Sequence, residues 1–289
     1  MFPLARWLSR QPLWLLHIAG AALGWLTYVL SPAYRRRFVG NVRQAGVSSA
    51  AARPAIAHAG RVLLEMPYLW LRPAGKPIMP SPILRGAELV EAAHAKGRGI
   101  VFLTPHMGCF EITAQAIAEH FAPRHGPITV LYRPARKAFL RDLMDNTRAR
   151  PGVSTAPATL AGVRQLMRAL RRGESVGLLP DQVPPDGMGV WAPFFGKPAY
   201  TMTLAARLVQ QTGAVPLLVW GERLADGRGF TVHFLPLEEA LPADPQAQEQ
   251  SAAVMNRAMQ QLILQCPQQY LWGYQRYKQP READDAGIE

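Results

Sequence analysis

The sequence predicts an α/β fold with a mainly parallel central sheet covered by helices, because short apolar runs alternate with helical patterns along the chain. Each run is too short for a buried helix and is typical of a strand covered on both faces. The strand candidates are residues 99–103, 128–133, 175–180, 214–219 and 230–235. The helical patterns between them are residues 110–120, 137–149, 158–172 and 200–212. A chain of 289 residues, 49% of them apolar, can bury one large α/β domain or two smaller ones.

An uncharged apolar segment precedes this alternating region. Residues 13–30 carry no formal charge, and as a helix they would extend roughly 27 Å, close to the thickness of a bilayer core. We therefore expect a membrane-anchor helix. If it spans the bilayer, Arg35, Arg36 and Arg37 directly after it place the rest of the chain in the cytoplasm. A helix lying in the membrane interface and a buried soluble helix stay open, since His17 and several glycines weaken the apolar signal.

The chain divides into three predicted segments. Residues 1–37 are the membrane anchor and its basic flank, residues 38–278 are the main domain, and residues 279–289 are a polar tail that we expect to be disordered. Within the main domain, residues 38–72 are predicted to form amphipathic helices. The proline-rich residues 72–82 are a connector, since too little chain precedes them to build a separate core.

The charge and the cysteines restrict the class of partner. A net charge of +12 predicts an anionic partner, which could be nucleic acid, acidic lipid headgroups or an acidic protein. Four of the seven tryptophans lie within the first 70 residues, as membrane-interface anchors do, and are not interleaved with lysines, which argues against nucleic acid. The two cysteines form no CxxC pair and no HExxH motif occurs, so neither a disulfide scaffold nor a zinc site is indicated.

The segment Thr-Pro-His-Met-Gly-Cys-Phe-Glu at residues 104–111 follows the first predicted strand. Inside one helix, His106 and Glu111 would lie about 140° apart and could not easily meet. Pro105 ends the strand, however, so we expect His106 in the strand-to-helix turn and Glu111 in the first helical turns, where its carboxylate reaches back to an imidazole nitrogen. Such a pair is a general base and the group that orients it. A capping histidine with a solvated glutamate is the alternative that spacing alone leaves open.

Several ordered blocks resemble the glycerolipid acyltransferase superfamily with its H-x4-D/E signature. The blocks are TPHMGCFE after a buried strand, YRP at 132–134, LPDQ at 179–182 and AVPLLV at 214–219. Residues 181–219 and the closing CPQQYLWGYQRYK at 266–278 look more specifically like the lipid A biosynthesis (lauroyl/myristoyl) acyltransferases of Gram-negative bacteria. The resemblance covers nearly the whole chain. It departs from many relatives at LWGYQRYK, where they carry histidine and arginine before the last aromatic residue.

The resemblance implies a glycerolipid acyltransferase-like fold and acyl transfer without a metal or prosthetic group. His106 would be the general base that deprotonates an acceptor hydroxyl, with Glu111 as its partner, so that the alkoxide attacks an acyl thioester directly. The resemblance also implies that Arg133 and Arg148 bind or support the active site, and their positive charge suits a tetrahedral oxyanion or substrate phosphates. The positions that the resemblance assigns to substrate binding are Arg133, Arg148, Asp181 and Gln182.

The resemblance also implies the partners and the location. The donor would be acyl carrier protein, a co-substrate, and the acceptor a hydroxyl of the Kdo-bearing lipid A precursor, at the cytoplasmic face of the bacterial inner membrane. The acidic carrier, the anionic precursor and membrane phospholipids all account for the basic charge. One helix, residues 158–172, carries four arginines away from the apolar stripe that begins at Leu160, and these could face the carrier or the membrane. The alternative acceptor is another lysolipid or glycolipid.

Two further motifs suggest different chemistry. GESVG at residues 173–177 matches G-x-S-x-G, and Asp181 and His233 follow in the order of an α/β-hydrolase. Ser175 leaves a helix and enters a strand, which is the reverse of a nucleophile elbow, so a serine hydrolase is only a remote alternative. Cys109 could be a thiolate nucleophile, but we expect a small buried packing residue instead.

Overall fold

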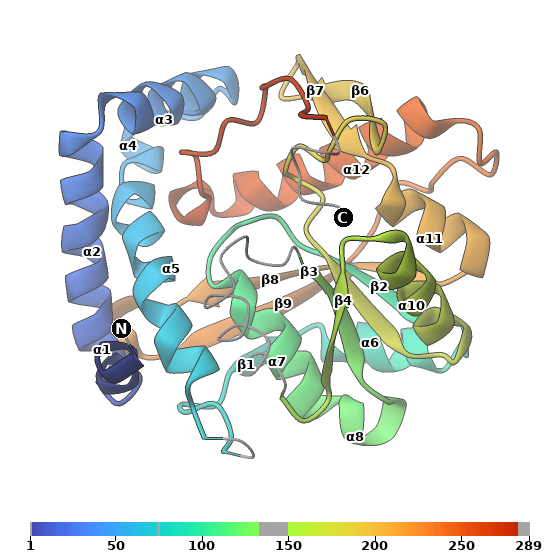
Figure 1. Ribbon diagram of the computed structural model, residues 1–289, viewed down its shortest axis with the longest axis horizontal. Helices are drawn as coiled ribbons and strands as arrows, with labels where there is room; N and C mark the ends of the chain where they lie inside the picture. Colours follow the sequence, from blue (N-terminus) through green and yellow to red (C-terminus); the bar gives the residue numbers. More distant parts are fainter. Residues whose placement is uncertain (1, 74–75, 133–149, 283–289) are drawn as a thin grey trace.

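The computed structural model describes residues 2–73, 76–132 and 150–282. Helices surround a central sheet (Figure 1). The strand order in that sheet is β1-β9-β8-β2-β5-β3-β4. The strands are β1 (Ile83–Arg85), β2 (Ile100–Leu103), β3 (Ile128–Tyr132), β4 (Val153–Pro157), β5 (Ser175–Leu178), β8 (Val215–Arg223) and β9 (Phe230–Pro236). Neighbouring strands are parallel except β8 and β9, which pair antiparallel. The sheet is therefore mixed and mostly parallel, and the predicted α/β class is confirmed.

Helices cover both faces of the sheet. Side chains alternate along β2, so Val101 and Leu103 enter the core on one face while Ile100 and Phe102 enter the core on the other. All four are buried, which explains why this run is apolar throughout. The first face is covered by α10 (Leu160–Arg171), α11 (Leu204–Thr212) and α12 (Gln248–Gln265), and the second by α6 (Ala87–His94) and α7 (Phe110–His120).

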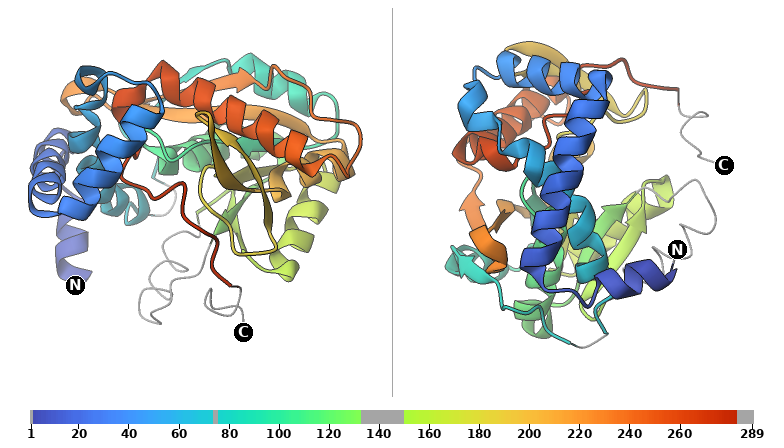
Figure 2. Two further views of the ribbon diagram at one scale, coloured as in Figure 1. Left: turned by 90° about the horizontal axis from the view of Figure 1, so that it is seen from above. Right: turned by 90° about the vertical axis from the view of Figure 1, so that its left-hand side faces the viewer.

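The N-terminal helices pack beside one edge of this layered body. They are α1 (Phe2–Leu8), α2 (Leu13–Leu30), α3 (Pro32–Gln44), α4 (Ser49–Ala52) and α5 (Ala55–Trp70). Two views show α2 lying along α5 (Figure 2). A Cβ added at Gly24 or Gly60 would collide with the backbone of the opposite helix, so these glycines permit the close approach. His17 of α2 is buried and ion-paired with Glu65 of α5 at 2.6 Å.

The apolar helix α2 is a candidate membrane anchor. Within the described residues it alone is long and apolar enough to cross a membrane, a criterion of length and composition that other kinds of helix also meet. Only 28% of its residues are buried against the rest of the molecule. Its exposed large apolar side chains are Trp14, Ile18, Leu26, Val29 and Leu30.

The predicted elements agree with the structure except in one region. Helix α7 occupies the predicted residues 110–120. The prediction of a helix over 200–212 was wrong at its start, because residues up to Met202 belong to β7 (Lys197–Met202), which pairs antiparallel with β6 (Gly189–Phe194). Phe195 and Gly196 both have positive φ, as a two-residue hairpin turn requires. The predicted helix over 137–149 and most of the predicted disordered tail lie outside the described residues.

Candidate active site

His106 lies in the turn between β2 and α7, at the carboxyl ends of β2 and β5. Such crevices at the carboxyl ends of parallel strands are where α/β proteins bind ligands. Gly108 has φ +57°, and a Cβ there would collide with the carbonyl oxygen of Gly221 in β8. The amide of Gly108 donates to the carbonyl of Gln269, and the amide of Cys109 donates to the carbonyl of Gly221, both at 2.8 Å. The turn is thus fixed against β8 and the C-terminal segment.

The imidazole of His106 is oriented by Asp181. One carboxylate oxygen lies 2.7 Å from Nδ1, and the other accepts the backbone N–H of His106 at 2.9 Å. Burial alone would raise the pKa of the Asp181 carboxyl, but the charge and hydrogen bonds of His106 and the charge of Arg276 outweigh it and lower that pKa. An ionised carboxylate at Nδ1 holds the ring proton there, which leaves Nε2 as the nitrogen that can accept a proton.

The sequence led us to expect Glu111 beside the imidazole and Asp181 at a substrate position. In the structure the orienting carboxylate at Nδ1 belongs to Asp181, because Asp181 follows β5, which lies directly beside β2 in the sheet. Glu111 lies in the first turn of α7, where its carboxylate accepts a hydrogen bond from Nε1 of Trp70 at 3.2 Å. It lines the same cavity as His106. Its predicted catalytic role therefore stays a prediction.

The remaining predicted site residues are not brought together by the described part of the chain. Gln182 follows Asp181 and is half-buried, but it does not line the cavity beside His106. Arg133 and Arg148 lie outside the described residues. The predicted substrate-binding roles of all three remain predictions.

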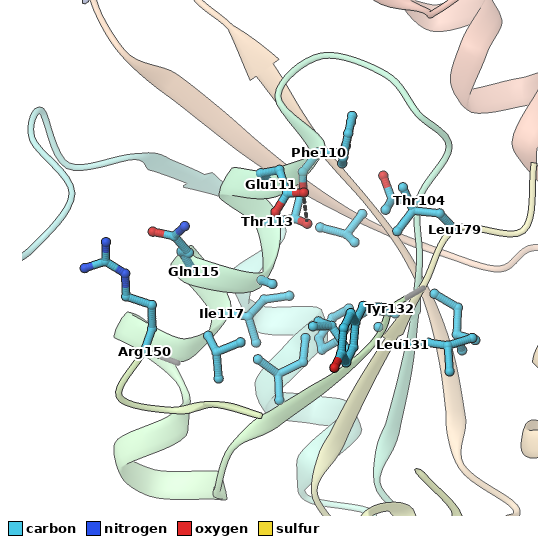
Figure 3. A pocket seen from close by; sticks show the side chains of 18 of the residues that line it. Thr104, Phe110, Glu111, Thr113, Gln115, Ile117, Leu131, Tyr132, Arg150 and Leu179 are labelled. Atoms are coloured by element: carbon cyan, nitrogen blue, oxygen red, sulfur yellow. Dashed lines mark hydrogen bonds between the residues drawn. The ribbon is translucent and has the colours of Figure 1, made fainter. Parts of the chain in front are cut away.

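A cavity of about 250 Å³ adjoins His106 (Figure 3). Most of its wall is apolar and comes from Phe102, Phe110, Ile117, Ile128, Val130, Leu131, Leu178, Leu179 and Val219. Thr104 lies at one end, whereas Gln115 and Arg150 lie at the opposite end (Figure 3). Apolar walls that converge on a few polar groups are typical of a small-molecule site. This one suits an aliphatic chain whose reacting end lies near the imidazole.

Neither the G-x-S-x-G segment nor Cys109 is placed to act as a nucleophile. Ser175 begins β5, which ends at Leu178, and Asp181 lies beyond that opposite end with its carboxylate bound to His106. His233 stacks on Trp220 with ring centroids 4.6 Å apart. No serine triad is therefore assembled by these residues. Cys109 is 2% exposed, and burial raises the pKa of its thiol well above the ordinary value, which confirms a packing residue and disfavours a thiolate.

Among residues 2–73, 76–132 and 150–282, no group of three or more His, Cys, Asp or Glu side chains is placed to hold a metal ion. The site instead offers a carboxylate-oriented imidazole beside an apolar cavity on an α/β sheet. Such an imidazole can act as a general base, and the cavity beside it can take an apolar chain. The chain belongs to the bacterial lipid A biosynthesis acyltransferase family, whose sequence model matches residues 18–279.

Three similar proteins agree with this assignment and with the resemblance seen in the sequence. The chain is 26% identical over 220 residues to the lipid A biosynthesis palmitoleoyltransferase of Escherichia coli (strain K12), covering 76% of this chain and 68% of that protein. It is 28% identical over 220 residues to the lipid A biosynthesis lauroyltransferase of the same organism, covering 76% and 69%. A lipid A biosynthesis acyltransferase of Haemophilus influenzae is 28% identical over 200 residues, covering 69% and 60%.

Proposed function

We propose that the protein transfers a fatty acyl chain from acyl carrier protein to a hydroxyl of the Kdo-bearing lipid A precursor. The observation that carries this proposal is the His106–Asp181 pair beside an apolar cavity in a chain of the lipid A acyltransferase family. The acceptor hydroxyl is that of a 3-hydroxyacyl chain, so the product is an acyloxyacyl ester. The proposal includes no metal or prosthetic group.

In the proposed reaction, Nε2 of His106 takes the proton of the acceptor hydroxyl while the oxygen attacks the thioester carbonyl carbon. A C–O ester bond forms and the C–S bond breaks. The imidazolium then gives its proton to the departing thiolate of the carrier. Asp181 stays ionised and stabilises the imidazolium that forms in between. The predicted substrate contacts are Arg133, Arg148 and Gln182, and Glu111 keeps its predicted catalytic role near the imidazole.

The carrier protein is proposed to dock on the basic face of α10. Arg164, Arg168 and Arg171 of this helix are exposed, as is Arg172 directly after it, which is ion-paired with Glu174. The predicted apolar stripe on this helix was wrong at Leu160, which is 75% exposed, because the buried side is formed by Leu166, Ala169 and Leu170. The exposed basic face therefore complements an acidic partner.

The N-terminal helices are proposed to hold the enzyme at the cytoplasmic face of the inner membrane. Large apolar side chains are exposed on α1, α2, α3 and α5, among them Trp7, Trp14, Val39 and Leu63. Arg35, Arg36 and Arg37 flank them and complement anionic phospholipid headgroups. This surface would bring the acyl acceptor to the enzyme within the bilayer plane.

The donor and the acceptor are identified by one matrix of transfer assays. Purified full-length chain is given a labelled acyl chain on acyl carrier protein or on coenzyme A, together with the tetra-acylated precursor with Kdo, the same precursor without Kdo, or a lysophospholipid. We expect product from the carrier protein and the Kdo-bearing precursor, and at least about tenfold lower kcat/KM from the other combinations, a difference of 1.4 kcal/mol. Transfer to the lysophospholipid alone would favour the alternative acceptor class.

A further inference from the structure

A second cavity, of about 650 Å³, continues from the far end of the first. The two share Gln115, Arg150 and Val153 in their walls. Gln115 and Arg150 are the side chains that lie away from the Thr104 end of the first cavity (Figure 3). The second cavity is bounded by the C-terminal half of α7, by α8 (Ala122–His125) and by the connector after α5. It is not used by the chemistry at His106.

The second cavity is positively charged. Three of its lining residues are cationic, namely Arg72, Lys76 and Arg150, against one carboxylate, Glu119, which leaves a formal excess of two positive charges. Arg72 is paired with Glu119 at 2.8 Å. Burial lowers the pKa of Arg72 and of Arg150, and the charge of Arg72 lowers the pKa of Arg150 further. The two guanidinium groups therefore repel each other, and an anion beside them would relieve that repulsion.

Buried polar atoms without a hydrogen-bond partner are concentrated here. Four such atoms belong to residues of this cavity, namely Arg72 Nη1, Gln115 Oε1, His120 Nε2 and Arg150 Nε. In the rest of the described chain there are two, on Trp220 and Arg276. Because buried polar groups are nearly always satisfied, the cluster indicates a ligand that offers several acceptors and at least one donor. Gln115 is only 6% exposed, so its oxygen cannot turn to bulk water.

The two guanidinium groups are already held in place by the fold. Arg72 donates from Nε to the carbonyl of Lys76 at 2.7 Å. Arg150 donates to the carbonyls of Leu69 and Trp70, which end α5. Arg72 Nη1 and Arg150 Nε therefore keep N–H groups without a partner on side chains that are already held in place, so little side-chain freedom is lost when a ligand binds.

We propose that this second cavity binds the phosphate monoester of a phosphorylated sugar in the acceptor, while the acceptor hydroxyl lies at His106. This rests on the proposed function, in which the acceptor is an anionic glycolipid. A phosphate monoester carries about −1.5 to −2 charges near pH 7 and three acceptor oxygens, which matches the two positive charges. Sugar hydroxyls supply the donor for Gln115. A phosphodiester, such as that of the carrier's pantetheine arm, carries one charge and is the poorer match.

The geometry of α7 sets the expected separation of the two groups. Glu111 lines the catalytic cavity and Glu119 lines the second one. Eight helical residues at 1.5 Å each separate them by about 12 Å along the axis. The acceptor's phosphate is thus bound about two helical turns away from its reacting hydroxyl, which positions the hydroxyl without contacting the acyl chain.

In the binding test, glucosamine 1-phosphate is titrated into the full-length chain without any acyl donor, and binding is measured by titration calorimetry. We expect wild type to bind the probe and Lys76→Gln to bind it about tenfold or more weakly, since a hydrogen bond to a charged group is lost. Lys76 is exposed, so this variant keeps the fold, and Arg72→Gln should show the same loss. The matched control is Arg257→Gln on α12, where an exposed arginine is ion-paired with Glu239. No binding by wild type, or equal affinity in all variants, would overturn the proposal.

A kinetic test separates this proposal from the proposed function. Acyl transfer is measured with the precursor and with the same precursor lacking one sugar phosphate. We expect Lys76→Gln to raise KM about tenfold for the phosphorylated acceptor, with kcat unchanged, and to leave KM for the dephosphorylated acceptor unaltered. A rise in KM for the carrier protein instead would assign the cavity to the donor and overturn the proposal. If neither acceptor is acylated by wild type, the proposed function fails, and the calorimetry still decides whether the cavity binds a sugar phosphate.

Discussion

Asp181→Asn is expected to lower kcat for acyl transfer by about 10³- to 10⁴-fold, the effect seen when a carboxylate that orients a catalytic histidine becomes an amide. An asparagine keeps the size of the side chain and one acceptor oxygen, but it cannot stabilise an imidazolium and can present its NH₂ group to Nδ1. The ring would then hold its proton on Nε2, where it cannot act as a base. Steady-state transfer with saturating donor and acceptor measures this loss.

The control for this variant lies in the same loop. Asp186→Asn makes the same chemical change at an exposed position and should leave kcat within about twofold, as surface substitutions generally do. Circular dichroism of both variants checks the fold. If Asp181→Asn kept its activity while Glu111→Gln lost it, the orienting carboxylate would be Glu111 after all, and the assignment from Nδ1 geometry would be wrong.

Glu65→Ala is expected to lower the free energy of unfolding by about 3–5 kcal/mol, the cost of leaving a buried charge unpaired. Glu65 is 1% exposed and forms a two-pronged ion pair with Arg223, with Oε2 accepting from Nη2 at 2.7 Å. The same guanidinium donates to the carbonyl of Gly108 in the catalytic turn at 3.0 Å. Loss of Glu65 therefore also loosens the turn that carries His106, and kcat should fall with stability.

The acid dependence of stability follows from the same pair. Burial opposes ionisation of Glu65, but Arg223 and His17 outweigh it and lower the pKa from 4.5 to about 2. A carboxyl with a lowered folded-state pKa stabilises the fold fully above its ordinary pKa and loses that effect as the pH falls toward the folded value. Denaturant unfolding should show that the free energy of unfolding falls more between pH 7 and pH 2 for wild type than for Glu65→Ala. Glu239→Ala, at an exposed ion pair with Arg257, should leave the free energy of unfolding nearly unchanged because water and salt screen that pair. An equal loss of stability in both variants would contradict the role of the buried pair.

The position of His106 could be predicted from local sequence, because an apolar run followed by Thr-Pro marks the end of a buried strand. The partner of His106 could not be predicted in this way. It depends on β5 lying directly beside β2, although β3 and β4 come between them in the chain. One signal was available: Asp181 follows an apolar strand, and parallel neighbours end at the same edge of a sheet. We instead predicted Glu111 as the partner because it lies only five residues from His106. A sequence pattern shows such local partners but not those that strand order brings together.

Other features depend on contacts that no local pattern contains. The second cavity joins Arg72 from the connector, His120 from α7 and Arg150 from the segment before β4. Each of these side chains alone is an ordinary polar residue in the sequence. The hairpin of β6 and β7 was missed because its turn, Phe195 and Gly196, lacks the usual Asn-Gly or Asp-Gly signal. Burial of His17 likewise depends on its ion pair with Glu65, forty-eight residues away in sequence.

The most direct test of the account is transfer of a labelled acyl chain from acyl carrier protein to the tetra-acylated, Kdo-bearing precursor by wild type, His106→Ala and Cys109→Ser side by side. The account predicts product with wild type and Cys109→Ser, and at least about a 10³-fold loss with His106→Ala, the scale expected when a general base is removed. Transfer lost in Cys109→Ser but retained in His106→Ala would contradict direct transfer with a histidine base. No transfer by folded wild type beside an active control enzyme would contradict the proposed donor and acceptor.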